Sequence, residues 1–382
     1  LGDNFFRKPS VLGAFFPGLM HLDMAGYIRK THQELWPGSA NRQEITEEQI
    51  FKIPAQMTKF DADDQGVTFG ISCEACHFGC KQHVEDPKKL PSFAPISEFL
   101  RLQNDSNQLQ TGRTHENLNW ACSRCHTGSR PLFAGGMSTW NSTEYSDAMK
   151  GSCYTRLNCI ECHQPHKATG PKWSKTPAQD DATCIRCHEQ YSTDEAIAEH
   201  THHSVGSSGA RCMNCHMPRI NEGLQEVVRT HTIFSPTAKE MIENNHPNAC
   251  NLCHTDETIQ WTTDYLKQWY NAEFDSQKIA QSYSPDQKVG IGWLQSKNEA
   301  VRLTVLDAMG RNQDRWAGND LITILDDPYL LNRQFAVDVV EKVFDLDLDH
   351  FGYKFYMTPA ERQNPIANVR QSLGLRAEPE QE

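Results

Sequence analysis

The sequence is dominated by one five-residue pattern, Cys-x-x-Cys-His, which occurs six times between residues 73 and 254. Two thiols at this spacing can add across the two vinyl groups of a haem, and the histidine that follows can bind the haem iron. At the cysteine and histidine frequencies of this chain, chance predicts roughly 0.02 matches. The six copies span Cys73–His77, Cys122–His126, Cys159–His163, Cys184–His188, Cys212–His216 and Cys250–His254.

Zinc sites and disulfide frameworks also use paired cysteines, but neither requires a histidine directly after the second cysteine in every copy. We therefore interpret the pattern as six covalently bound haem c groups. The predicted haem-binding cysteines are Cys73, Cys76, Cys122, Cys125, Cys159, Cys162, Cys184, Cys187, Cys212, Cys215, Cys250 and Cys253, and the predicted proximal iron ligands are His77, His126, His163, His188, His216 and His254. Cys80 and Cys153 remain, and they either pair with each other or serve as small buried apolar residues.

The composition agrees with a fold built on cofactors. The chain has 382 residues, of which 38% are hydrophobic, and this is thin for an ordinary core of that size. Six porphyrins would supply the missing apolar surface. We therefore expect a mainly α fold with extensive loops, namely a multihaem cytochrome c fold organised on stacked haems, plus a small C-terminal helical-repeat segment.

The formal net charge of −12 bears on partners. This negative charge argues against binding to nucleic acid or to anionic membrane surfaces. Its main expected effect is to keep the protein soluble, and it also favours basic partner proteins. The sequence contains no run of 18 consecutive apolar residues, so it predicts no transmembrane helix. The chain begins at Leu1 without an apolar signal core, so we expect a mature secreted chain that is periplasmic or extracellular, where c-type haem is attached. A removed lipoprotein signal stays open, although no N-terminal cysteine is present.

Three regions are expected: an N-terminal helical segment packing on haems (1–65), a hexahaem cytochrome c domain (66–275), and a C-terminal helical region with a frayed tail (276–382). In the first region, His21–Trp36 is predicted to be helical, and His21 and His32 would share one face. At least one of them is a candidate distal iron ligand; the alternative is that both are ordinary surface histidines. Residues 39–60 carry a second helix signal.

Other histidines stand near the motifs in positions suited to distal ligands. His83 follows the first motif, and His115 precedes the second motif by seven residues. His166 lies just beyond the proximal His163, so it should point away from that haem and can bind a neighbouring one. His200 and His203 are one helical turn apart and share a face. Helices are expected at Ser97–Leu109, at Asp194–His203, around Pro236–Asn244, and at Thr258–Tyr270, where the helix would cover the last haem.

The C-terminal third follows the last motif and contains no cysteine, and its sequence pattern predicts helices. Glu299–Gly310 predicts an amphipathic helix that ends at glycine. A second is expected at Asn319–Leu325, and a third would open with Asp327 as cap and Pro328 in the first position. Val301-Arg302 and Asn332-Arg333 are 31 residues apart in similar settings, a period that resembles HEAT-type repeats. Two repeats are too few to stand alone, so we expect them to pack on the haem domain.

Three stretches go beyond the haem motifs themselves: Gly151–His166, His200–His203 followed by Cys212–Pro218, and Arg229–His231 followed by Pro247–His254. Together they resemble the multihaem cytochromes related to cytochrome c nitrite reductase and hydroxylamine oxidoreductase, and in particular their relatives fused to helical repeats. The resemblance covers about residues 66–270, and it implies that His166, His203 and His231 are distal ligands. Relatives often carry Gly-Pro-Gly where this chain has Phe78, Gly79 and Cys80 before His83.

Of the 17 histidines, 11 lie outside the six motifs, which is enough to give every iron a second imidazole. Six-coordinate iron cannot bind a substrate, so the leading hypothesis is an electron-transfer protein with redox donor and acceptor partners. The C-terminal region would dock a partner or a second copy. Methionine offers another iron ligand, but it is more often core filler. The methionines weighed for this role are Met20, Met24, Met57, Met137 and Met149.

Two alternatives remain open. The first is an oxidoreductase with one open haem that reduces or oxidises a small nitrogen or sulfur oxyanion. Nitrite reductases mark their catalytic haem with Cys-x-x-Cys-Lys, whereas all six motifs here end in histidine. The second is a subunit of a cytochrome filament or of a membrane respiratory complex. We favour the electron carrier over the enzyme.

Overall fold

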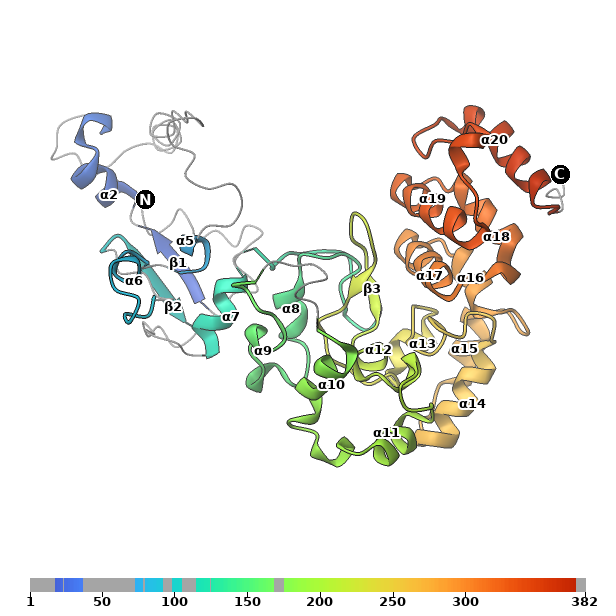
Figure 1. Cartoon of the computed structure of the whole chain (residues 1–382), viewed down its shortest axis with the longest axis horizontal. Coiled ribbons are helices and arrows are strands. Elements are labelled where there is room, and N and C mark those ends of the chain that lie inside the picture. Colours follow the sequence, from blue (N-terminus) through green and yellow to red (C-terminus); the bar gives the residue numbers. More distant parts are fainter. Residues whose placement is uncertain are drawn as a thin grey trace. The chain divides into compact units, whose positions relative to one another are not determined.

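The computed structural model describes residues 18–22, 24–36, 73–77, 80–91, 98–104, 115–123, 125–167 and 175–375 (Figure 1). The chain divides into two compact units. Unit 1 comprises Leu1–Ser129 and Tyr154–Lys167, and unit 2 comprises Arg130–Cys153 and Ala168–Glu382. Within the described ranges the chain is mainly helical with long loops, and none of the helices is long and apolar enough to span a membrane.

Unit 1 holds a two-stranded antiparallel sheet and several short helices. Strand β1 (Gly18–Leu22) pairs with β2 (Leu100–Asn104), and His21 stands opposite Arg101. The helices are α2 (Met24–Thr31), η1 (Gln33–Leu35), α5 (Cys73–Cys76), α6 (Lys81–Glu85), α7 (His115–Ser123), η2 (Tyr154–Arg156) and α9 (Cys159–Cys162).

Two predictions for this unit are wrong. His21 lies on a strand, so it does not share a helix face with His32. Residues 98–99 form a turn and the strand β2 follows, where a helix was expected. The local pattern explains the difference, because Leu100-Arg101-Leu102-Gln103 alternates apolar and polar residues with the period of a strand. The helix expected in residues 39–60 lies outside the described residues.

The first part of unit 2 carries the last three motifs on short elements. Helix α10 begins with a capping box between Thr176 and Gln179 and has proline in its first turn. Helix α11 ends at a left-handed residue, His202. The helix expected at Thr258–Tyr270 is confirmed. The helix expected at Asp194–His203 is present but ends at Thr201, so the prediction that His203 lies on it is wrong. The elements are α8 (Glu144–Ala148), α10 (Pro177–Ile185), η3 (Glu189–Tyr191), α11 (Asp194–Thr201), η4 (Ser208–Ala210), α12 (Cys212–His216), β3 (Arg219–Asn221), β4 (Val228–Arg229), α13 (Lys239–Glu243) and α14 (Ile259–Tyr270).

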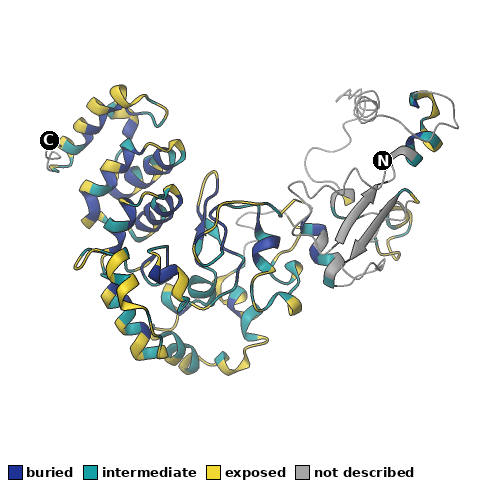
Figure 2. Ribbon diagram, turned by 180° about the vertical axis from the view of Figure 1, so that it is seen from behind, coloured by how far each residue is buried: buried dark blue, intermediate teal, exposed yellow. Residues whose placement is uncertain are grey.

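The C-terminal part of unit 2 contains most of the apolar core. Helix α17 packs against α16 and α19, and side chains such as Leu303, Leu306 and Val340 are fully buried (Figure 2). Burial of this apolar surface is what stabilises the helices, since most helical stability comes from packing. The elements are α15 (Ser276–Ser282), α16 (Val289–Leu294), α17 (Glu299–Asn312), η5 (Arg315–Ala317), α18 (Gly318–Thr323), η6 (Ile324–Asp326), α19 (Leu330–Phe344), η7 (Leu348–Phe351) and α20 (Pro359–Ser372).

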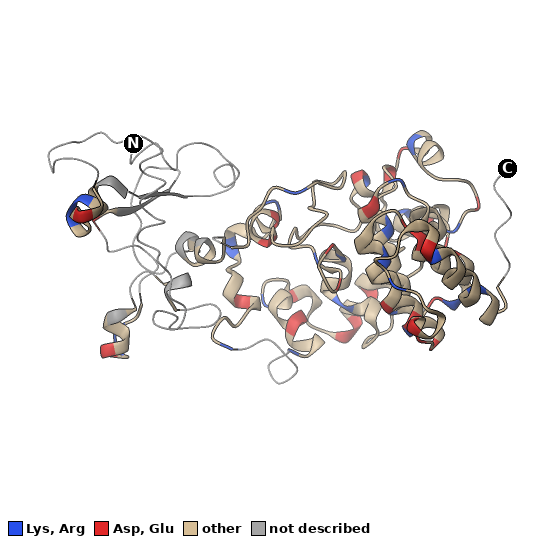
Figure 3. Cartoon of the chain, turned by 90° about the horizontal axis from the view of Figure 1, so that it is seen from above, with Lys and Arg blue, Asp and Glu red and all other residues tan. Residues whose placement is uncertain are grey.

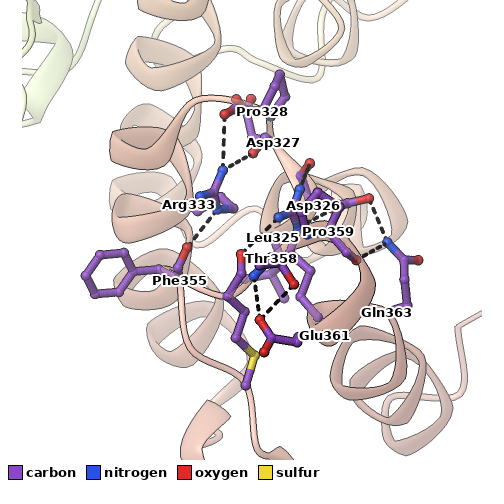
Figure 4. A network of polar contacts seen from close by, with 12 residues as sticks. Leu325, Asp326, Asp327, Pro328, Arg333, Phe355, Thr358, Pro359, Glu361 and Gln363 are labelled. Carbon is purple, nitrogen blue, oxygen red and sulfur yellow. Dashed lines mark hydrogen bonds and ion pairs between the residues drawn. The ribbon is translucent and has the colours of Figure 1, made fainter.

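A polar network joins α17, α19 and the loop before α20. The Asp327 carboxylate accepts two hydrogen bonds from Arg302, at 2.6 and 3.0 Å, and one from the main-chain N–H of Tyr329. Arg333 donates to the main-chain carbonyls of Asp327, Pro328 and Phe355 (Figure 4). The prediction that Asp327 caps the helix directly is wrong in its detail, because α19 begins at Leu330. The Asp327 carboxylate instead ties the helix entrance to α17.

The end of α17 also differs from its prediction. The helix continues past Gly310 and ends at Gln313, which adopts a left-handed conformation with φ of 62°. Gly310 is needed for packing, because a Cβ atom there would lie 2.7 Å from a methyl carbon of Val339. The glycine therefore marks the close approach of α17 to α19 rather than a helix end.

Candidate haem-binding sites

The motifs fold as single helical turns. In five of them the main-chain N–H of the histidine donates to the carbonyl of the first cysteine, over 2.8–3.1 Å. The sixth, Cys212–His216, is the helix α12 itself. Positions i, i+3 and i+4 of a helical turn share one face, so both thiols and the imidazole are presented on the same side. Covalent attachment of a haem needs this arrangement.

The structure brings motifs together in pairs. In unit 1 the Cys122 and Cys159 side chains are neighbours, and this proximity raises the pKa of the Cys122 thiol. In unit 2 Cys184 and Cys212 make the equivalent contact, which raises the pKa of Cys212. The first cysteines of motifs 2 and 3 are therefore neighbours, and so are those of motifs 4 and 5.

The fifth and sixth motifs also approach each other. Burial raises the pKa of Cys215 to about 11, and the nearby Cys253 thiol adds to the rise. A second thiol, Cys250, has a pKa of about 12, raised first by burial and then by Cys215. Motif 5 thus lies between motifs 4 and 6 within unit 2.

Three pairs of histidine rings lie at one nearly constant separation. The ring centroids of His77 and His166 are 6.1 Å apart, those of His200 and His216 are 6.2 Å apart, and those of His203 and His254 are 6.2 Å apart. Each pair joins one motif histidine to one histidine outside the motifs. Two of the predicted distal ligands, His166 and His203, are therefore among the paired histidines.

This separation fits an iron ion between the rings. Two imidazoles that bind one metal ion from opposite sides, each through a nitrogen about 2 Å away, have centroids about 6 Å apart. The partners of the other ring nitrogen agree with this. Nδ1 of His216 lies 2.8 Å from the carbonyl oxygen of Phe234, and Nδ1 of His203 lies 2.5 Å from that of Thr201. Such hydrogen bonds fix the tautomer in which Nε2 is available to a metal.

Two of the paired histidines, His200 and His254, have lowered pKa values. Burial lowers the pKa of His200, and the nearby His216 lowers it further. Burial likewise lowers the pKa of His254, with a smaller effect from His203. Neutral imidazole is the form that binds a metal. The chemistry of this donor set therefore fits haem iron.

The other predicted distal ligands have different surroundings. Nδ1 of His83 lies 2.7 Å from the carbonyl oxygen of Lys89, and Nε2 of His115 lies 2.8 Å from that of Tyr154. His231 is half-buried, and the side chain of His21 lies outside the described residues. Each iron that His126, His163 or His188 would bind needs a second axial ligand, and the identity of that ligand stays a prediction.

His200 also pairs with a motif histidine, although only His203 of the two was among the predicted distal ligands. The sequence places His200 three positions before His203, but α11 ends at Thr201, so the two histidines do not share a face of that helix. The structure also places His202, the residue between them, apart from both pairs: its ring stacks on Trp269 with centroids 4.3 Å apart.

The two cysteines outside the motifs do not form a disulfide bond in the described part of the chain. Cys80 is buried, with 5% of its surface exposed, and Cys153 is half-buried. Of the two uses open to Cys80, the structure agrees with a small buried apolar residue.

Comparison with known proteins gives two family matches. Residues 198–300 match the cytochrome c552 family, and residues 154–193 match a doubled CXXCH motif. The chain is 25% identical over 149 residues to the multiheme cytochrome MtrA of Shewanella baltica (strain OS185); the match covers 39% of this chain and 36% of the relative. No solved structure matches. With the motif geometry described above, these matches show that the chain is a multihaem c-type cytochrome.

Proposed function

We propose that the chain is an electron-transfer protein that relays electrons through six haem c groups, most of them bound by two histidines. Bound haem supplies a one-electron iron couple. The observation that carries the proposal is the set of three histidine pairs at 6.1–6.2 Å. Iron with two imidazole ligands has no vacant position for a substrate, so such a site can only accept and release electrons.

The contacts between motifs support an order of haems within each unit. In unit 1 the third motif would neighbour the first through His166, which faces His77, and the second through Cys159, which contacts Cys122. In unit 2 the fifth motif would neighbour the fourth through Cys212 and the sixth through Cys215. Close neighbours of this kind suit rapid transfer of electrons from one site to the next.

Helix α11 has a particular role in this relay. His200, near the end of α11, and His203, which follows the left-handed His202, would supply the distal ligands of the fifth and sixth haems. Tyr270 of α14 donates a hydrogen bond to the carbonyl of His200 over 2.6 Å and holds the end of α11 in place. The end of α11 and the turn that follows it would thereby fix two neighbouring sites relative to each other.

The remaining features concern partners and location. Periplasmic or extracellular placement suits c-type haem, and a donor and an acceptor protein would complete the relay. The net charge of −12 favours basic partners, although acidic and basic side chains are interspersed over the C-terminal helices (Figure 3). These helices, with the two similar Arg302 and Arg333 settings, would act as a HEAT-like docking segment. The resemblance to nitrite reductase and hydroxylamine oxidoreductase relatives agrees with this arrangement of cofactors.

A second candidate function rests on the fourth motif. The three histidine pairs in the described part of the chain do not include His188. An iron held there by His188 alone would be open to a small nitrogen or sulfur oxyanion, and the protein would then be an oxidoreductase. A third possibility is that the protein is a subunit of a cytochrome filament or of a membrane respiratory complex. This role differs from that of the electron carrier only in the partner.

Electron paramagnetic resonance of the oxidised protein, with haem content from the alkaline pyridine assay, tests the proposal. We expect six low-spin haems. His200→Ala and His203→Ala should each convert one haem to high spin, because each removes one imidazole. His350→Ala is the matched control, since its side chain is 81% exposed and far from any motif in sequence. A high-spin haem in the unmodified protein would contradict the electron-carrier proposal and favour the oxidoreductase.

A further inference from the structure

Motifs 2 and 3 are neighbours, and so are motifs 4 and 5. In each pair the same kind of hydrogen bond is made by a residue that lies outside the Cys-x-x-Cys-His pattern. Asn119 lies three residues before Cys122, and its Oδ1 accepts a hydrogen bond from the main-chain N–H of Cys159 over 2.9 Å. Asp181 lies three residues before Cys184, and its Oδ1 accepts from the main-chain N–H of Cys212 over 3.1 Å. The same relative position therefore makes the same contact in unit 1 and in unit 2.

Helix geometry explains the contact. A residue three positions before a cysteine lies on the same face of the helix, so Asn119 and Asp181 extend toward the motif that their own cysteine contacts. The N–H that each accepts belongs to the first residue of a short helix, α9 or α12, and such a group has no partner inside its helix. Both side chains are buried, with exposed fractions of 1% for Asn119 and 7% for Asp181.

The two contacts differ in charge. Asn119 is neutral, and its Nδ2 donates to the carbonyl of Leu157 over 3.2 Å. Asp181 forms an ion pair with Arg211 at 3.0 Å, and the Arg211 side chain is 29% exposed. The position equivalent to Arg211 in unit 1, directly before the first cysteine, is Asn158. One pair of motifs is thus joined by an amide and the other by a buried carboxylate with a partly exposed cation.

We propose that Asn119 and Asp181 are equivalent positioning residues that hold the two haem-binding motifs of each pair together, and that the Asp181 carboxylate lowers the reduction potential of its pair. This inference rests on the proposed electron relay. A buried negative charge beside a motif stabilises the oxidised haem, which carries one more positive charge than the reduced haem. The effect is large in a site of low effective dielectric constant and small for a solvent-exposed charge.

The test uses the full haem-loaded chain and substitutions that change the charge of a side chain but hardly change its shape. Asp181→Asn should move the reduction of two haems to more positive potentials in a spectroelectrochemical titration. Arg211→Gln should move the same haems to more negative potentials, and by less, because Arg211 is partly exposed. A loss of packing alone would not produce shifts of opposite sign at two residues that touch each other.

Asn119→Asp is the matched variant in unit 1, and it should shift a different pair of haems to more negative potentials. This variant keeps the inference testable if Asp181→Asn lowers haem incorporation. Titration curves of Asp181→Asn and Asn119→Asp that superimpose on that of the unmodified protein, at unchanged haem content, would overturn the inference and leave the relay intact. A haem content well below six in the unmodified protein would instead overturn the relay itself.

Discussion

Gly209 offers the sharpest test of the ligand assignment, because it lies against the ring of His203. A Cβ atom at position 209 would be 2.1 Å from Cδ2 of that ring and 2.7 Å from its Nε2. Carbon atoms in contact are about 3.5 Å apart, so Gly209→Ala would displace the ring by about 1.4 Å. Metal–ligand distances tolerate about 0.2 Å. The displacement would break the proposed bond between His203 and iron.

The expected result is one high-spin haem in the oxidised Gly209→Ala protein, with the total haem content unchanged. Electron paramagnetic resonance at low temperature and the visible spectrum measure this directly. His203→Ala should give the same spectrum, because both changes would remove the same imidazole from the haem attached at Cys250 and Cys253.

The neighbouring substitution Ser208→Ala is the control. It alters the same turn at an exposed side chain and introduces no atom near His203. We expect it to preserve the low-spin spectrum. If Gly209→Ala also kept every haem low spin, the pairing of His203 with His254 would be refuted.

Three further predictions concern unit 2. Asp327→Ala should lower the free energy of unfolding by about 3–5 kcal/mol in denaturant titration, because it leaves the largely buried Arg302 guanidinium without its carboxylate. Gly310→Ala should cost about 1–3 kcal/mol in the same assay, since the new methyl group would crowd Val339. Burial raises the pKa of the Glu222 carboxyl from its ordinary value of 4.5 to about 7. The folded state therefore keeps a proton that the unfolded state loses, so stability should fall as pH rises from 4.5 to 7, and Glu222→Gln should flatten that slope.

Each of these has a contrary outcome. An Asp327→Ala protein as stable as the original would show that the ion pair with Arg302 contributes nothing. Full tolerance of Gly310→Ala would mean that α17 and α19 separate at little cost. An unchanged pH profile in Glu222→Gln would assign the slope to other groups.

The success of the motif prediction has a local cause. Cys212, Cys215 and His216 lie within one helical turn, and hydrogen bonding within that turn is enough to present them on one side. Long helices were also predictable. Ile259–Tyr270 has apolar residues at helical spacing and a threonine cap, and the structure contains that helix almost without change.

The failures have a nonlocal cause. Strand β2 forms because Leu100–Asn104 pairs with Gly18–Leu22, and no pattern within either segment announces a partner so far away in sequence. Helix α19 begins at Leu330 rather than at Pro328, because Asp327 is drawn into hydrogen bonds with Arg302 of α17. In the second case a tertiary contact overrides a sound local preference, whereas in the first it selects the partner of a segment that already has the period of a strand.

By itself, the sequence determined the number of Cys-x-x-Cys-His motifs, the cysteines and histidines within them, and the surplus of histidines outside them, and it thereby predicts haem attachment. The tertiary structure decided which histidine faces which motif. His166 meets His77 across 88 intervening residues, and His200, which was not among the predicted distal ligands, meets His216. The physical reason is that haem attachment needs only neighbours within one turn, whereas a second axial ligand is chosen by the packing of distant segments.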